Sequence, residues 1–384
     1  MRKLRILDLD GSLTTQSSLF PPEAAEWVPA RIWGPRIRLA CTFGTFERFR
    51  RWLDGAFESG DPGITFYGSG DFHHVSLALL KRLPGPFNLL VLDKHPDWMR
   101  GIPFLHCGTW LRQALRLANL RCVFHCGGEL DFDNAYRWLA PWHEIKAGRV
   151  VVFPAQRPFN RGRWAEITVH PLLSEGVSLA PALNDALRPF RAELNRLPLY
   201  ISIDKDVLSA DDAAVNWDSG LLRLPEAVTI LDSFLSAARG RLAGADLLGD
   251  WSPVQLGHWL NRLCDRLDHP SPVHDPNEAA RRNGKANEAL LQVLLSGHVA
   301  PSQDRFATCI LDRKTYPRGQ ARAQSNGSDP RHPFSGCRRA ARRQPEQPFS
   351  ACRPGSPAAI LAVLPVPDRP HRRRSSRGRE PGSA

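Results

Sequence analysis

The sequence has no long apolar run, no cysteine framework and, in its first 300 residues, no excess of charge of one sign. No stretch approaches the ~18 consecutive apolar residues that a membrane-spanning helix needs. The N-terminal "MRKLRILDLDGS" is too acidic, and its apolar part too short, for a signal peptide. The eight cysteines are scattered without the spacing of a secreted disulfide scaffold. These absences argue against a membrane-spanning or disulfide-stapled secreted protein and predict a cytoplasmic one.

The net charge of +12 is concentrated at the C-terminal end of the chain. Residues 301–384 hold 17 Lys and Arg against 6 Asp and Glu, together with 12 of the 33 prolines. The preceding residues are close to neutral, so no nucleic-acid partner is expected for them. Residues 298–384 are predicted to form a disordered basic tail. This tail is either an arm that touches nucleic acid or acidic surfaces, or the product of translation past the natural stop.

Short apolar runs bounded by Gly, Asp or Pro alternate with helical periods along residues 1–297. Each run has the length of a strand and is apolar at consecutive positions, as expected for a parallel sheet that is covered on both faces. Strands are expected at residues 5–10, 64–70, 88–93, 121–127, 149–154, 199–204 and 244–250, and helices at 73–83, 225–239 and 255–268. The pattern predicts one α/β domain with a three-layer, doubly wound and mainly parallel sheet.

Aspartates and histidines follow three of the expected strands directly. The three stretches are "YGSGDFHHVS" (67–76), "LLVLDKHPDW" (89–98) and "YISIDKDVL" (200–208). Because the carboxyl ends of the strands in such a sheet carry its working residues, these side chains are expected to lie together. Buried carboxylates this dense repel one another unless cations hold them. The oxygen-rich donor set, with one or two imidazoles, favours Mn²⁺ or a similar divalent ion.

The donor inventory is large enough for two ions. A pair of bridged ions lowers the pKa of the water between them, which gives a hydroxide able to attack a C–N bond. A single one of these stretches is as readily a polar loop, but three of them in order on strand ends favour a site.

The three stretches resemble, in order and context, the motifs of the arginase, agmatinase and deacetylase superfamily. That superfamily carries a Gly-Gly-Asp-His-Ser loop, an Asp-Ala-His-x-Asp strand end and a Ser-x-Asp-x-Asp strand end. The resemblance covers about residues 64–253 and is closest to bacterial arginase-like proteins of unassigned substrate. It implies a ureohydrolase-like hydrolase acting on a small-molecule substrate, with about two Mn²⁺ per chain, or Zn²⁺ or another divalent ion in their place. A homo-oligomer is also compatible with it.

The resemblance implies six metal ligands, two of which, Asp93 and Asp204, would bridge the ions. The six are His74, Asp93, His95, Asp97, Asp204 and Asp206. The first loop has one residue more than the pattern, so His73 and His74 are both eligible, and the spacing to Ser76 favours His74.

Two further residues are implied as catalytic. His106 in "FLHCGTW" matches a histidine that shuttles protons in the superfamily, although a satisfied structural histidine is an equal alternative. Asp250 in "GADLLGDWSP" is the carboxylate nearest to the position of a glutamate that faces a guanidinium. Three tryptophans that follow the motifs, Trp98, Trp217 and Trp251, are candidates for the wall of an apolar or cation-binding pocket.

Two alternative functions compete with this interpretation. "LDLDGSLT" (7–14) resembles the nucleophile loop of haloacid-dehalogenase-type phosphatases, with Asp8 as nucleophile and Asp10 as acid and base. That alternative leaves the Asp and His cluster unexplained, and "GDWSPV" lacks the second aspartate that such a phosphatase needs. The other alternative is a catalytically inactive arginase-like scaffold, because fold alone does not fix function.

Overall fold

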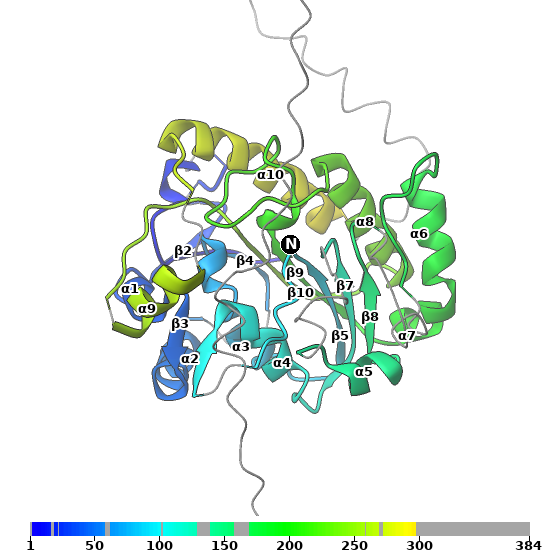
Figure 1. The fold of residues 1–384 in the computed structure, drawn as a ribbon, viewed down its shortest axis with the longest axis horizontal. Coiled ribbons are helices and arrows are strands. Elements are labelled where there is room, and N and C mark those ends of the chain that lie inside the picture. Colours follow the sequence, from blue (N-terminus) through cyan, green and yellow to red (C-terminus); the bar gives the residue numbers. More distant parts are fainter. Residues whose placement is uncertain are drawn as a thin grey trace, which may run out of the picture. The chain divides into compact units, whose positions relative to one another are not determined.

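The structure is a computed structural model that describes most of the first 296 residues. The described residues are 2–16, 19–21, 23–57, 62–100, 103–128, 139–156, 169–257, 259–268 and 272–296 (Figure 1). The tail expected at residues 298–384 lies outside them and stays a prediction. Within the described part of the chain, no helix has both the length and the apolar character required to cross a membrane.

Eight parallel strands form the central sheet, in the order β2-β1-β4-β10-β9-β5-β7-β8 (Figure 1). Their bounds are β1 Leu4–Asp8, β2 Glu26–Pro29, β4 Ile64–Phe66, β5 Phe87–Leu92, β7 Leu120–Cys126, β8 Val150–Phe153, β9 Leu199–Asp204 and β10 Leu242–Leu248. Every residue of the central strands β5 and β9 is buried, which explains their continuous apolar runs. The parallel sheet predicted from those runs is confirmed.

Helices cover both faces of the sheet, which confirms the three-layer arrangement (Figure 1). One face packs against α2 Phe43–Ala56, α3 Val75–Leu80, α4 Trp110–Ala114 and α5 Trp142–Lys146. The other packs against α6 Leu179–Leu187, α7 Arg191–Arg196, α8 Leu224–Ala237 and α10 Pro276–Ser296. Successive residues of one strand, such as Leu90 and Val91 of β5, point to opposite faces and enter the two opposite cores.

Three short strands were not expected from the sequence. Strand β2 is a half-buried edge strand that ends at a proline, so it lacks the apolar run of a central strand. Strands β3 (Ala40–Thr42) and β6 (Phe104–His106) form a separate antiparallel pair. Helix α9 (Trp259–Asp268), within the helix expected at 255–268, packs against β3 beside that pair. Strands β3 and β6 have only three residues each, which is too few to give a reliable alternating pattern in the sequence.

A buried ion pair ties the end of β9 to the end of β10. The Lys205 ammonium, which is fully buried, donates to Asp250 Oδ2 and to Asn287 Oδ1, each at 2.8 Å. Gln16 Nε2 and Asn287 Nδ2 donate to the other oxygen of Asp250, at 2.8 and 3.2 Å. Since Asn287 belongs to α10, the network fastens the last described helix onto the centre of the sheet. Each polar atom that the network buries in this way has a partner.

Replacement of Lys205 by Met is expected to lower the free energy of unfolding by about 3–5 kcal/mol, because it leaves the buried Asp250 carboxylate without its cation. Urea titration of the full chain measures this change. Lys285→Met, on the exposed side of α10, is the matched control and should change the free energy by no more than about 0.5 kcal/mol. Equal, small effects of both substitutions would contradict a stabilising role for the ion pair.

Candidate metal centre

The candidate centre lies where β5 and β9, neighbours in the sheet, reach their carboxyl ends. Asp93 follows β5 directly and Asp204 is the last residue of β9. The third contribution comes from the loop after β4, which β10 separates from β9. This loop must therefore cross the end of β10 to reach the two aspartates.

Two glycines, one in the crossing loop and one directly after β10, allow the backbone to approach Asp204 closely. A Cβ atom on Gly70 would lie 2.8 Å from Asp204 Oδ2. A Cβ atom on Gly249, whose φ is +90°, would lie 2.4 Å from Asp204 Oδ1. Both distances are too short for any side chain, so the carboxylate of Asp204 is enclosed by backbone on two sides.

His73 stands among three carboxylates. Its Nδ1 lies 2.9 Å from Asp97 Oδ2, 3.1 Å from Asp93 Oδ2 and 3.6 Å from Asp204 Oδ2. Asp97 adopts a left-handed backbone with φ of +50°, a region that aspartate enters more readily than most residues. The indole N–H of Trp110 donates to Asp97 Oδ2 at 2.6 Å and so fixes this carboxylate.

A second group of donors shares Asp93 with the first. His95 Nδ1 lies 2.7 Å from Asp206 Oδ2 and 3.9 Å from Asp93 Oδ1. The ligand atoms of His73, Asp93 and Asp97 lie within 4.8 Å of one another, and so do those of Asp93, His95 and Asp206. Asp93 therefore offers one oxygen to each group, which is the arrangement of a bridging carboxylate.

His74, the histidine that the spacing to Ser76 favoured, does not join either group. It is fully buried, and neither of its ring nitrogens has a hydrogen-bond partner of regular geometry in the described structure. Burial is the main cause that lowers the pKa of His74 to about 3, and the charges of His106 and His73 lower it further. Successive residues of a helical turn project about 100° apart, so only one of the two histidines reaches the carboxylates. Of the two eligible histidines, the structure therefore places His73 and not His74 among the carboxylates.

The aspartates of the centre repel one another strongly. Burial raises the pKa of Asp93 well above its usual value, and the charges of Asp97 and Asp206 raise it further. Burial, together with Asp206, raises the pKa of Asp204 to about 7. Burial disfavours the charged ring of His73, but Asp93 and Asp97 outweigh it and raise the pKa of His73 well above its usual value.

The second group shows the same balance. Burial opposes the charged form of His95, yet the neighbouring Asp206 raises the pKa of His95 to about 9. Burial would raise the pKa of Asp206, but His95 and the Lys94 backbone N–H lower it below its usual value. The charged forms of the four aspartates thus depend on positive charge at two points, His73 and His95.

The donor set fits divalent cations. Three carboxylates and two imidazoles make up the two groups, and the sulfur ligands that favour softer ions are absent from both. A fourth carboxylate, that of Asp204, lies 3.6 Å from His73 Nδ1. Asp93 Oδ2 is buried without a regular hydrogen-bond donor, so one of its lone pairs remains available. A cation at each point would replace the repulsion with attraction.

A hydrogen-bonded chain that the sequence did not reveal orients His73. Its Nε2 lies 3.1 Å from Ser202 Oγ, and Ser202 Oγ donates to Asp246 Oδ1 at 2.7 Å. Because the hydroxyl proton of Ser202 is directed to Asp246, its oxygen accepts from His73 Nε2–H. This arrangement keeps the proton of a neutral His73 on Nε2, so Nδ1, which faces the carboxylates, can act as a metal ligand once its own proton has left. Tyr67, Ser76 and Tyr200 also donate to the fully buried Asp246.

The two residues predicted as catalytic differ in their positions. His106 is buried, and its Nδ1 accepts from the Gly108 N–H at 3.0 Å. A Cβ atom on Gly108 would lie 3.4 Å from His106 Nδ1 and 3.8 Å from Asp97 Oδ1, so His106 borders the first group of donors. Asp250, in contrast, faces Lys205. The expectation that Asp250 faces a substrate is corrected, because the buried ammonium occupies its carboxylate.

The aspartates of the phosphatase-like stretch serve local structure. Asp8 pairs with Arg31 at 2.7 Å and accepts from the Gly11 N–H. Asp10 accepts from Ser252 Oγ at 2.7 Å and from the Ser69 N–H at 3.1 Å, which joins the β1 end to the crossing loop. Both oxygens of each carboxylate have donors, which disfavours attack on phosphorus by Asp8.

Ser202→Ala is expected to weaken Mn²⁺ binding by about 10–100-fold, because it removes the group that orients His73. Isothermal titration calorimetry with Mn²⁺ measures the change. Ser236→Ala, on the exposed side of α8, is the control and should bind as the wild type does. An unchanged affinity of the Ser202 variant would show that the hydrogen-bonded chain does not support the centre.

Mn²⁺ affinity is also expected to fall as the pH is lowered through 7. Below the raised pKa of Asp204, this carboxylate carries a proton that must leave before a cation binds. Each displaced proton should reduce the apparent affinity by about tenfold per pH unit. Calorimetry at pH 6, 7 and 8, in buffers with different ionisation enthalpies, counts the protons released. An affinity that is constant over this range would contradict the raised pKa.

Comparison with known proteins gives relatives of limited similarity. No family model matches the chain. Over 206 residues, it is 28% identical to an uncharacterized protein of Thermotoga maritima. The match covers 54% of this chain and 65% of that protein, so it spans slightly less than two thirds of the length of this curated relative.

Similar solved structures include an arginase, an agmatine ureohydrolase and a formimidoylglutamase. The arginase of Bacillus caldovelox is 12% identical with a TM-score of 0.47, covering 77% of this chain and 98% of that one. The agmatine ureohydrolase of Thermoplasma volcanium is 12% identical with a TM-score of 0.44, covering 77% and 90%. The formimidoylglutamase of Bacillus subtilis is 12% identical with a TM-score of 0.45, covering 78% and 88%. The chain is similar to these structures at 12% identity and at TM-scores below 0.5.

Proposed function

We propose that the chain is a metal-dependent hydrolase of the arginase-like superfamily that cleaves a C–N bond in a guanidino or amide substrate. The observation that carries the proposal is the position of Asp93 between two groups of donors, one with His73 and one with His95. A carboxylate shared in this way suits two cations a few ångströms apart. The proposal includes Mn²⁺ as the ion, about two ions per chain and a cytoplasmic location.

The residues of the two groups would hold the ions. Bound divalent cations supply Lewis acidity and a nucleophile that is available at neutral pH. The chain itself contributes the fixed geometry of the donors, because Ser202 orients His73 and Trp110 orients Asp97. Rigid donors keep the cations in place while a substrate binds and leaves.

His106 is the proposed proton carrier. Its Nδ1 accepts from the Gly108 N–H, so the neutral ring carries its proton on Nε2. A neutral imidazole next to the first group can donate that proton to a leaving nitrogen and recover it from solvent. The role is independent of whether the leaving group is an amine or a guanidino nitrogen.

The metal content of the full chain tests the proposal. Elemental mass spectrometry of protein prepared with Mn²⁺ is expected to give about two ions per chain for the wild type. Asp204→Ala should lose at least one of them, because Asp204 Oδ2 lies 3.6 Å from His73 Nδ1 and Asp204 Oδ1 accepts from the N–H of Asp206. Asp211→Ala is the matched control, since the side chain of Asp211 is 76% exposed and pairs only with Arg223 in the described structure.

A chain that binds the ions should then release urea, ammonia or a free amine from a panel of guanidino and amide compounds. The proposal fails if the wild type takes up no stoichiometric transition metal. It also fails if the chain instead hydrolyses phosphate esters with Mg²⁺ and loses that activity in Asp8→Asn, which would favour the phosphatase alternative.

A further inference from the structure

We propose that Trp217 is a specificity-determining residue, forming a fixed wall that selects substrates with a flat, apolar and uncharged group beside the scissile bond. This inference rests on the proposed function, because it concerns the substrate of the same metal centre. Three features carry it: the hydrogen bond that holds the indole, its position on the accessible side of the centre, and a mainly apolar pocket lined in part by the preceding residue, Asn216.

The indole of Trp217 is hydrogen-bonded to one member of a buried ion pair. Its N–H donates to Asp71 Oδ1 at 2.8 Å. The other oxygen of Asp71 accepts from Arg38 Nε at 2.6 Å, and both of these charged side chains are buried. Arg38 in turn donates to Ser252 Oγ and to the Pro253 carbonyl, each at 3.0 Å. The indole N–H is therefore held by a network that joins the loop after β4, Arg38 before β3 and the loop after β10.

Trp217 borders the open side of the metal centre. The side chain of His95 is 36% exposed, whereas those of His73, Asp93, Asp97, Asp204 and Asp206 are each 6% exposed or less. A substrate therefore approaches from the side of His95. The Trp217 ring lies there, with its centroid 5.4 Å from that of His95 and an angle of 65° between the planes. Trp217 itself is half-buried, so part of its surface is available to a ligand.

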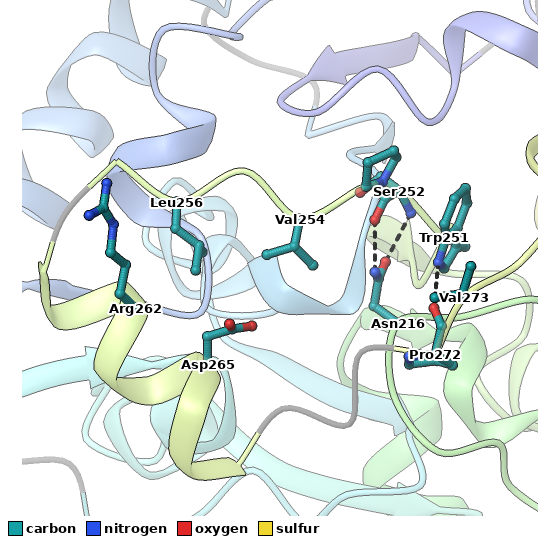
Figure 2. A pocket seen from close by; sticks show the side chains of 10 residues that line it. Asn216, Trp251, Ser252, Val254, Leu256, Arg262, Asp265, Pro272 and Val273 are labelled. Carbon is teal, nitrogen blue, oxygen red and sulfur yellow. Dashed lines mark hydrogen bonds between the residues drawn. The ribbon is translucent and has the colours of Figure 1, made fainter.

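A pocket with a mainly apolar lining opens beside the loop that carries Trp217. It has a volume of about 480 Å³, and Asn216, the residue before Trp217, contributes to its lining (Figure 2). Figure 2 shows Val254 and Leu256 along one side and Trp251 at one end. Leu256 and Trp217 both pack on the small core between α9 and the β3 and β6 pair.

The polar atoms at the pocket floor are already paired. Asn216 Nδ2 donates to the Ser252 carbonyl at 2.8 Å, and Asn216 Oδ1 accepts from the Ser252 N–H at 3.0 Å (Figure 2). The space offered is therefore mainly apolar surface, within the range of volumes that small-molecule sites occupy. A flat ring or short hydrocarbon is the group that such a surface takes from water most favourably.

The charges around Trp217 disfavour a cationic group. Asp250, the carboxylate expected to face a guanidinium, is buried against Lys205. The charge of Asp71, which accepts from the indole N–H of Trp217, is balanced by Arg38. Arg262 also lines the pocket, as does Asp265. A cation would gain only the attraction of the ring face, so a neutral group is favoured over a charged one.

Paired hydroxamic acids test the inference, because a hydroxamate binds a divalent ion whatever the natural substrate is. Calorimetry with the Mn²⁺-loaded full chain compares acetohydroxamic acid with benzohydroxamic acid, which adds a flat apolar ring. The phenyl compound is expected to bind about tenfold more tightly or better, because the ring is buried against Trp217. Its 4-aminomethyl derivative, which carries a positive charge, should bind more weakly than benzohydroxamic acid.

Variants of Trp217 assign the preference to this residue. Trp217→Ala should reduce the ratio of the two affinities to about 1–2, while Trp217→Phe should retain most of it. Bound Mn²⁺ should stay at the wild-type level in both, because Trp217 is not a ligand. Trp259→Ala, which removes an indole that is 67% exposed on α9, is the control and should keep the wild-type ratio.

The possible failures can be told apart. A chain that takes up no Mn²⁺ refutes the proposed function, and this inference with it. A chain that binds Mn²⁺ and both hydroxamates equally, or keeps its preference in Trp217→Ala, refutes the role of Trp217 alone. Tighter binding of the cationic derivative would overturn the choice of an uncharged substrate group and return a guanidino compound to first place.

Discussion

The mutual repulsion of four buried aspartates is the constraint on which the arrangement of this molecule depends. Asp93 and Asp204 stand at the ends of adjacent central strands and are almost fully buried, so each needs positive charge close by. The nearest positive groups are two imidazoles, one from the crossing loop after β4 and one from the loop after β5. The loops, the glycines beside Asp204 and the tryptophan that fixes Asp97 all serve this one requirement.

Two other buried carboxylates at β10 show two different ways to meet a similar requirement. Asp250 is balanced by an ammonium group, Lys205, and is thereby withdrawn from ligand binding. Asp246 receives only hydroxyl donors in the described structure, from Tyr67, Tyr200 and two serines, and burial raises its pKa. One of these hydroxyls, that of Ser202, also contacts His73 Nε2, so the buried carboxylate of Asp246 is connected to His73 through a hydrogen-bonded chain.

Much of the centre could be predicted from the sequence because its residues follow continuous apolar runs. Such runs indicate buried parallel strands, and Asp93 and Asp204 stand where two of them end. The choice between His73 and His74 could not be predicted, because it depends on the phase of one helical turn. Asp246 also escaped notice, because it lies inside an apolar run and its partners come from separate parts of the chain. The pairing of Asp250 with Lys205 could not be predicted either, because it depends on β9 and β10 being neighbours and on the two side chains facing each other after those strands.

The strand order also has a consequence for the way the protein is made. The last two strands of the described sheet, β9 and β10, occupy its middle, between β4 and β5. Until residues 199–248 have left the ribosome, the edges of β4 and β5 that will pair with them have no partner within the sheet. In the final strand order, the strands made by then fall into two sets, β2-β1-β4 and β5-β7-β8, that do not touch, and the unpaired backbone groups of β4 and β5 are open to other chains during that interval. Insertion of the late strands completes the ligand set at the same moment as it closes the sheet, so that cation uptake by this protein would report on the final step of its folding.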